Sequence, residues 1–155
     1  MKNFSSKLTL PQKIIEVVCA AVLLVMVLGP IIFWGRLPDQ IPGHFNGAGE
    51  IDRWASKWEL LLMPVFSVFM YALLSAACWF IGESVRKGEL PRSAYTWITG
   101  TKLVTIGNFA VIEWHSALAR PMGTWLLPVV IALLAVLITG FLISALQFAR
   151  NQKKE

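Results

Sequence analysis

Four long apolar stretches divide the chain, and polar or turn-forming residues separate them. They lie at about residues 10–35, 57–82, 95–118 and 124–148, with a polar segment, 36–56, between the first two. Roughly 20 helical residues cross a hydrocarbon core of about 30 Å, and each stretch reaches that length. The pattern predicts an all-α integral membrane protein, a bundle of four transmembrane helices with one short structured loop outside the membrane.

The composition supports a membrane location for the whole chain. Apolar residues make up 56% of the 155 residues and the mean hydropathy is +0.63, whereas soluble domains are roughly 45–50% apolar. We therefore expect residues 1–155 to form one membrane domain. The net charge of +5 comes from short Lys and Arg clusters beside the apolar stretches, which argues against nucleic acid as a partner. Cys19 and Cys78 lie inside apolar stretches and are expected to be buried and inert.

Two helix starts carry capping signals. Thr9, Pro11 and Gln12 form a first turn with an N-cap candidate, a proline and a glutamine at the third position. Ser56 and Glu59 form an S-x-x-E capping box just before the second apolar stretch. The loop is therefore expected to end beside this box.

Small residues and prolines indicate how the helices pack. Gly140 and Ser144, four positions apart, suggest a close-packing seam on the fourth helix. Pro30, Pro64 and Pro128 all lie toward the same end of the bundle as the loop. Proline removes a backbone hydrogen bond and can kink a helix, so either the bundle is splayed around a cavity at this end or ordinary packing accommodates the prolines.

The basic residues indicate the orientation, because Lys and Arg are in excess on the cytoplasmic side of membrane proteins. One side carries nine of them: Lys2, Lys7, Lys13, Arg86, Lys87, Arg92, Arg150, Lys153 and Lys154. The other side carries four: Arg36, Arg53, Lys57 and Arg120. We expect both termini in the cytoplasm and the loop outside. Five tryptophans then fall near the outer boundary as an interfacial belt: Trp34, Trp54, Trp58, Trp114 and Trp125.

The loop contains its own folding signals and candidate ligands. Asn46-Gly47 is typical of a type I′ turn and predicts a short hairpin between His44-Phe45 and the residues after Gly49. Its polar residues are candidate binding residues: Asp39, His44, Asn46, Glu50 and Asp52. Oxygen and imidazole groups bind divalent cations, and His44, Glu50 and Asp52 are weak metal candidates, although their spacing matches no EF-hand or zinc motif. In the alternative interpretation Asn46 and Asp52 bond to local backbone and His44 anchors the loop.

The third apolar stretch is the least apolar and needs protein neighbours, because it contains four candidate binding residues: Lys102, Asn108, Glu113 and His115. Lys102 and Glu113 fall on nearly the same helix face about 16 Å apart. Charged groups inside a bundle are functional candidates by default. Each also has a structural alternative: Lys102 snorkels to water, Glu113 pairs with Arg53, Lys57 or Arg120, and Asn108 makes an interhelical hydrogen bond. A weakly polar stripe on the second stretch is expected to face the third: Ser67, Tyr71, Ser75 and Cys78.

The loop also resembles a known family. Its signature is similar to that of the domain of unknown function 1648 family, in the run Leu37-Pro38, Ile41-Pro42, His44-Phe45-Asn46, Gly49, Asp52 and Lys57. The resemblance covers about residues 14–82. That domain also forms the N-terminal part of SdpI-type immunity proteins, which protect a cell from a secreted peptide toxin and sequester a regulator at the membrane. The resemblance implies a multi-pass protein of the bacterial cytoplasmic (inner) membrane and offers no catalytic residues.

These observations favour a recognition, signalling or toxin-immunity-like protein, rather than an enzyme, that acts through the outward loop and the polar outer half of the bundle. Its expected partners are the lipid bilayer and a peptide, lipid or membrane protein, with oligomerisation left open. The alternative is a small transporter or a metal-dependent membrane enzyme that uses the polar residues of the third helix. A third hypothesis is a subunit that scaffolds a larger complex. No cofactor is predicted beyond a divalent cation in the loop, and no hydrolase, phosphate-binding, dinucleotide-binding or haem motif occurs in the sequence.

Overall fold

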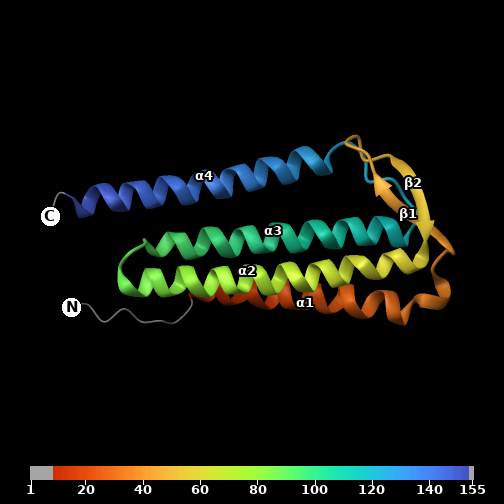
Figure 1. Ribbon diagram of the computed structural model, residues 1–155, viewed down its shortest axis with the longest axis horizontal. Coiled ribbons are helices and arrows are strands. Elements are labelled where there is room, and N and C mark those ends of the chain that lie inside the picture. Colours follow the sequence, from red (N-terminus) through yellow and green to blue (C-terminus); the bar gives the residue numbers. More distant parts are fainter. Residues whose placement is uncertain (1–8, 154–155) are drawn as a thin grey trace.

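The chain forms a helical bundle capped at one end by a β-hairpin (Figure 1). The computed structural model describes residues 9–153. The elements are α1 (Leu10–Ile32), η1 (Trp34–Arg36), β1 (Gln40–Phe45), β2 (Ile51–Ser56), η2 (Lys57–Leu61), α2 (Leu62–Lys87), α3 (Arg92–Ala117) and α4 (Leu126–Gln152), where η marks a short 3₁₀ helix. The four predicted helices and the predicted hairpin are present. Lys2, Lys7 and Lys154 of the charge count lie outside the described residues.

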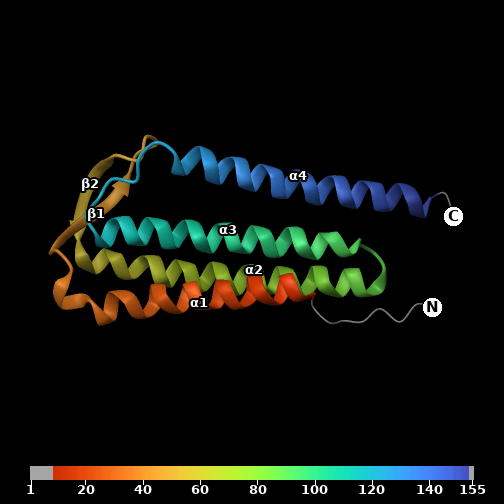
Figure 2. The same ribbon diagram turned by 180° about the vertical axis from the view of Figure 1, so that it is seen from behind.

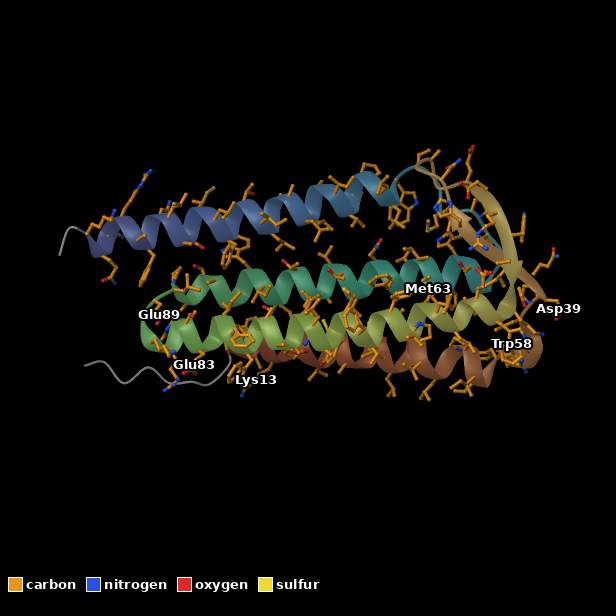
Figure 3. The ribbon with its side chains drawn as sticks, viewed as in Figure 1. Lys13, Asp39, Trp58, Met63, Glu83 and Glu89 are labelled. Carbon is orange, nitrogen blue, oxygen red and sulfur yellow. The ribbon has the colours of Figure 1, made fainter. Side chains whose placement is uncertain are left out.

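The hairpin lies at one end of the bundle, whereas α1 begins and α4 ends at the other (Figure 1). We call the two parts of the bundle the hairpin half and the terminal half. Figure 3 shows Lys13, Glu83 and Glu89 at the end of the terminal half, and Asp39 and Trp58 at the hairpin end.

The least apolar helix, α3, lies at the centre of the bundle. It packs against α1, α2 and α4, whereas α4 stands apart from α1 and α2 in both views (Figures 1 and 2). Among the described residues, α1, the segment Lys57–Lys87 and α4 are long and apolar enough to cross a membrane. Their exposed side chains are largely apolar, whereas Trp114 is the one exposed large apolar residue within α3. Three apolar helices thus shield a polar one.

The start of α1 is capped as predicted, but the start of α2 is not. The Thr9 backbone N–H donates to Gln12 Oε1 at 2.9 Å, and Gln12 Nε2 donates to Thr96 Oγ1 at 3.2 Å, which ties α1 to α3. The predicted box at Ser56 is wrong, because the Ser56 side chain makes no capping bond and Glu59 accepts two hydrogen bonds from Arg53, at 2.8 and 3.2 Å. A charge-assisted, two-pronged bond to a guanidinium is stronger than a bond to a neutral backbone N–H.

The seam between α3 and α4 depends on two glycines. A Cβ at Gly140 would lie 2.7 Å from the Trp97 ring, and a Cβ at Gly100 would lie 2.8 Å from Leu137 Cδ2. Each helix therefore offers a glycine to a large side chain of the other. The close packing predicted at Gly140 is present, whereas the Ser144 hydroxyl donates within its own helix, to the Phe141 carbonyl at 2.9 Å.

The hairpin turn is organised by the Asn46 side chain, which bonds to local backbone as the alternative interpretation of the loop predicted. Asn46 Oδ1 accepts hydrogen bonds from the backbone N–H groups of Ala48 and Glu50, at 2.9 and 3.0 Å. In the described turn a positive φ occurs at Gly49, at +74°, but not at Asn46 or Gly47. A type I′ turn requires positive φ at both of those central residues, so that prediction is wrong. The turn is stabilised instead by the hydrogen bonds that the Asn46 side chain accepts from the backbone.

The tip of the hairpin is fastened to the loop between α3 and α4. The Met122 backbone N–H donates to the Gly49 carbonyl at 2.9 Å, and the Gly123 backbone leaves no room for a Cβ at Gly49. This attachment holds the start of α4 beneath the hairpin, and Figure 1 shows α3 and α4 diverging toward it. Pro64 and Pro128 do not cause the divergence, because each is the third residue of its helix, where proline breaks no helical hydrogen bond.

Candidate functional site

A groove of about 880 Å³ lies in the hairpin half between α1 and α3. Its lining is mainly apolar and includes Val22, Val25, Met26, Gly29 and Pro30 from α1, Ala110, Val111 and Trp114 from α3, and Leu60 and Trp125 from neighbouring segments. Sites for small molecules and cofactors are typically concave, mostly apolar and roughly 300–1,000 Å³. The groove therefore has the size and character of a ligand site.

One carboxyl group lies among these apolar walls. Glu113 is 6% exposed, and its Oε2 atom is buried without a hydrogen-bond partner in the described part of the chain. The predicted ion pairs are wrong for the two hairpin cations, because Arg53 binds Glu59 and Lys57 binds Asp39 at 2.8 Å. A buried carboxylate is costly unless a partner compensates its charge. Glu113 is thus suited to receive a proton or a cationic group.

Two residues with nitrogen donors, His115 and Arg36, line the groove, and they differ in whether a partner is already bound. His115 Nδ1 lies 2.9 Å from the Pro121 carbonyl oxygen, which can only accept, so the ring is engaged as a donor. The Arg36 guanidinium lies over the Phe33 ring, 5.9 Å from its centroid, and forms no ion pair within the described residues. Arg36 is therefore the cation available at the mouth of the groove.

Lys102 belongs to a different site, in the terminal half. It is 1% exposed, its Nζ donates to Glu16 Oε2 at 2.6 Å, and it lies 3.8 Å from the centroid of the Tyr71 ring. The predicted snorkelling is wrong, because α1 presents a carboxylate at the depth of the lysine. Sequence reasoning missed Glu16. The available signal was its isolation, as the one acidic residue within α1.

Asn108, Ser67 and Cys78 form no hydrogen bond with Lys102 or Glu113 in the described part of the chain. Asn108 is half-buried on α3 and makes no interhelical hydrogen bond within the described residues. Ser67 and Cys78 are buried on α2, as expected for the stripe facing α3, and Tyr71 of that stripe contacts Lys102. The two buried charged residues of α3, Lys102 and Glu113, thus lie in separate sites.

The candidate residues of the hairpin are bonded to one another. The pairs are Lys57 Nζ to Asp39 Oδ1 at 2.8 Å, His44 Nδ1 to Asp52 Oδ1 at 2.6 Å, and Asn46 Nδ2 to Glu50 Oε2 at 3.0 Å. The His44–Asp52 pair joins the two strands, whereas the other two pairs lie at the base and at the turn of the hairpin, so the three pairs do not converge on one point. Among the described residues, no group of three or more His, Cys, Asp and Glu is placed to hold a metal ion.

Ion pairs in the hairpin region also shift the pKa values of Asp39 and Arg53. The hydrogen bond from Lys57, and then the charge of that lysine, lower the pKa of Asp39 below its usual value of 3.8. The hydrogen bonds to Glu59, and then its negative charge, raise the pKa of Arg53. Both groups remain charged at neutral pH, so the Lys57–Asp39 and Arg53–Glu59 ion pairs are formed under ordinary conditions.

Comparisons with known proteins assign part of this region to a family. Residues 21–68 match the family described as Domain of unknown function (DUF1648), which confirms the resemblance seen in the loop. An uncharacterized protein of Archaeoglobus fulgidus is 45% identical over 42 residues, which are 26% of this chain and 23% of that protein. The match therefore spans under a quarter of the relative. No solved structure is similar to this chain.

The matched segment contains only one side of the groove. It covers the α1 wall, the hairpin and the start of α2, whereas Glu113 and the rest of the α3 wall lie outside residues 21–68. The groove is thus built where the family segment meets the central helix.

Proposed function

We propose that this chain is a bacterial inner-membrane protein that recognises a hydrophobic ligand in the groove between α1 and α3. The observation that carries the proposal is an apolar groove with a single buried, unpartnered carboxyl group, Glu113. Such a combination of apolar walls and one polar group is typical of binding sites. Recognition of this kind serves signalling or toxin-immunity-like protection, with a peptide, a lipid or a membrane protein as the ligand.

All four helices cross the membrane in this proposal. The outer faces of α1, α2 and α4 expose large apolar side chains over their whole lengths, and such surfaces mark membrane or protein contacts. The central helix α3 tolerates charge because its neighbours cover it. Most basic residues outside the hairpin lie at the end of the terminal half, and this excess supports a cytoplasmic position for that half and an outer position for the hairpin.

The internal bonding of the hairpin gives it a supporting role. Its polar residues stabilise the strands, and its tip holds the start of α4 at Gly49. The hairpin therefore supports the end of the bundle, and the binding surface in this proposal is the groove between α1 and α3. The alternative of a transport path has less support, because Lys102 is bonded to Glu16 and does not line the groove.

Two glycines provide a matched test of recognition. Gly29 lines the groove and Gly107 does not, and a Cβ at either position would meet nothing within 4 Å. Native mass spectrometry of the chain extracted from its own membrane should show a bound hydrophobic molecule in the wild type and in Gly107→Leu. Gly29→Leu should lose it, because the new side chain fills the groove. Equal retention by both variants would overturn the proposal.

The orientation has a separate test. Gly47→Cys lies at the exposed hairpin turn and Glu89→Cys at the opposite end, while Cys19 and Cys78 are buried. A membrane-impermeant maleimide should label Gly47→Cys in intact cells and Glu89→Cys only after permeabilisation. The reverse pattern would place the hairpin in the cytoplasm.

A further inference from the structure

We infer that the ligand of the groove is a phospholipid with a primary amine in its headgroup, whose ammonium pairs with Glu113 and whose phosphate binds Arg36. This inference rests on the proposed function and names its ligand class. It uses three features of the groove: the unpaired carboxyl inside it, the unpaired cation at its mouth, and its length.

The first feature selects a cation. Glu113 Oε2 is buried with no partner in the described part of the chain, and the nearby hairpin cations Arg53 and Lys57 are already bonded to other carboxylates. His115, on the same helix, donates from Nδ1 to the Pro121 carbonyl and not to Glu113. A ligand ammonium would supply both the missing charge and a hydrogen-bond donor, and charge-assisted bonds of this kind are roughly twice as strong as neutral ones.

The second feature selects an anion near that cation. Arg36 lines the same groove and forms no ion pair among the described residues. A guanidinium binds phosphate through two parallel N–H donors and is the preferred side chain for this contact. A zwitterionic headgroup carries phosphate and ammonium together, so a single molecule supplies the partner that each of the two lining residues Arg36 and Glu113 lacks.

The third feature selects a lipid over a small soluble molecule. The α1 wall runs from Phe33 to Ala21, which corresponds to about 18 Å at 1.5 Å per residue. One leaflet is about half of a hydrocarbon core of roughly 30 Å. Several lining residues are also more than 50% exposed on the outer surface of the bundle, including Val25 at 69% and Trp114 at 65%. The groove thus opens sideways toward lipid and has the depth of one acyl chain.

The test compares headgroups at constant acyl chains. The full-length protein in detergent is mixed with dioleoyl phosphatidylethanolamine, phosphatidylcholine or phosphatidylglycerol, and bound lipid is counted by native mass spectrometry. Phosphatidylethanolamine should be retained about tenfold better than the other two, which corresponds to about 1.4 kcal/mol. Phosphatidylcholine carries a cation that cannot donate a hydrogen bond, and phosphatidylglycerol lacks the cation. Equal retention of the three lipids would overturn the inference.

Two pairs of variants separate the two contacts. Glu113→Gln should abolish the preference for phosphatidylethanolamine, whereas Glu89→Gln, which removes an exposed carboxylate at the opposite end, should keep it. Arg36→Gln should weaken all three phospholipids alike, whereas Arg120→Gln, an exposed arginine outside the groove lining, should not. A preference that survives Glu113→Gln would also overturn the inference.

Failure here is distinguishable from failure of the proposed function. If another hydrophobic molecule is retained by the wild type and lost in Gly29→Leu while no headgroup preference exists, the groove binds a ligand but not this lipid. If Gly29→Leu retains every bound molecule, both proposals fail, because the lipid then adheres to the outer surface.

Discussion

The two halves of the bundle use the same central helix in opposite ways. In the terminal half, Lys102 of α3 is bonded to Glu16 of α1, and Trp97 fills the space over Gly140 of α4. In the hairpin half, α4 diverges from α3 (Figure 1), and Glu113 lies in a groove where its Oε2 atom has no partner within residues 9–153. The buried charge of α3 in the terminal half is paired, whereas the buried charge of α3 in the hairpin half has no partner among the described residues.

The difference shows why a charge inside a bundle does not by itself identify a functional site. Lys102 and Glu113 are both buried charged residues on α3, and each is a functional candidate on sequence grounds. The presence of Glu16 makes Lys102 a structural residue. Glu113 Oε2 has no bonded partner among the described residues, which makes Glu113 the candidate for binding. Substitutions in the two halves should therefore change the free energy of unfolding by different amounts and in opposite directions.

The largest change in the free energy of unfolding is expected for the ion pair of the terminal half. Lys102→Met removes the partner of Glu16 and should lower the free energy of unfolding by about 3–5 kcal/mol, because an uncompensated charge is left behind. The double variant Lys102→Met with Glu16→Met should recover most of this loss, since apolar side chains can replace a buried ion pair. Chemical unfolding in detergent, followed by circular dichroism, measures both. A single variant as stable as the wild type would show that the pair contributes nothing.

A smaller loss is expected at the seam between α3 and α4. Gly140→Ala places a Cβ 2.7 Å from the Trp97 ring, and overpacking of this kind costs about 1–3 kcal/mol. Gly107→Ala is the matched control, because a Cβ there meets nothing within 4 Å and alanine favours the helix. The same unfolding measurement should show a loss for Gly140→Ala alone. Equal stability of the two variants would mean that α4 adjusts freely.

A gain in the free energy of unfolding is expected at Glu113, in the hairpin half. Glu113→Leu removes a buried, unsatisfied carboxyl from an apolar groove and should raise the free energy of unfolding by about 1 kcal/mol. Glu113→Gln keeps a polar group in place and should give a smaller gain. Unfolding of the delipidated protein measures the change without the contribution of a bound ligand. A clear loss of stability in Glu113→Leu would imply that the carboxyl has a structural partner.

The smallest effect is expected in the hairpin and depends on pH. The pKa of Asp39 is lowered from 3.8 by its bond to Lys57. Since the folded pKa is the lower one, the pair stabilises the hairpin fully above the unfolded pKa and this contribution is lost as the pH falls through the folded pKa. The stability difference between wild type and Asp39→Asn should therefore be present at about pH 6 and shrink below about pH 4. A difference that stays constant over this range would contradict the assignment to Asp39.

Sequence reasoning succeeded where the relevant interaction is local. Apolar length predicts the helices, and the glutamine at the third position of α1 does accept a hydrogen bond from Thr9. It failed where a side chain chose between near and distant partners. Glu59 was expected to cap its own helix but binds Arg53 of β2. At Asn46 two local interpretations were open, and the bonds of its side chain to nearby backbone form the turn in place of a type I′ turn. These alternatives differ in energy by little more than one hydrogen bond.

The sequence by itself determined the classes of structure: four helices, a hairpin between the first two, one polar helix that needs neighbours, and the family resemblance of residues 21–68. Only the tertiary structure decided which charges are compensated. The depth at which α1 packs on α3 gives Lys102 its partner Glu16, and the attachment of the hairpin at Gly49 accompanies an open groove around Glu113. Periodicity is a property of neighbouring residues, whereas the pairing of a buried charge depends on which helices meet and at what depth.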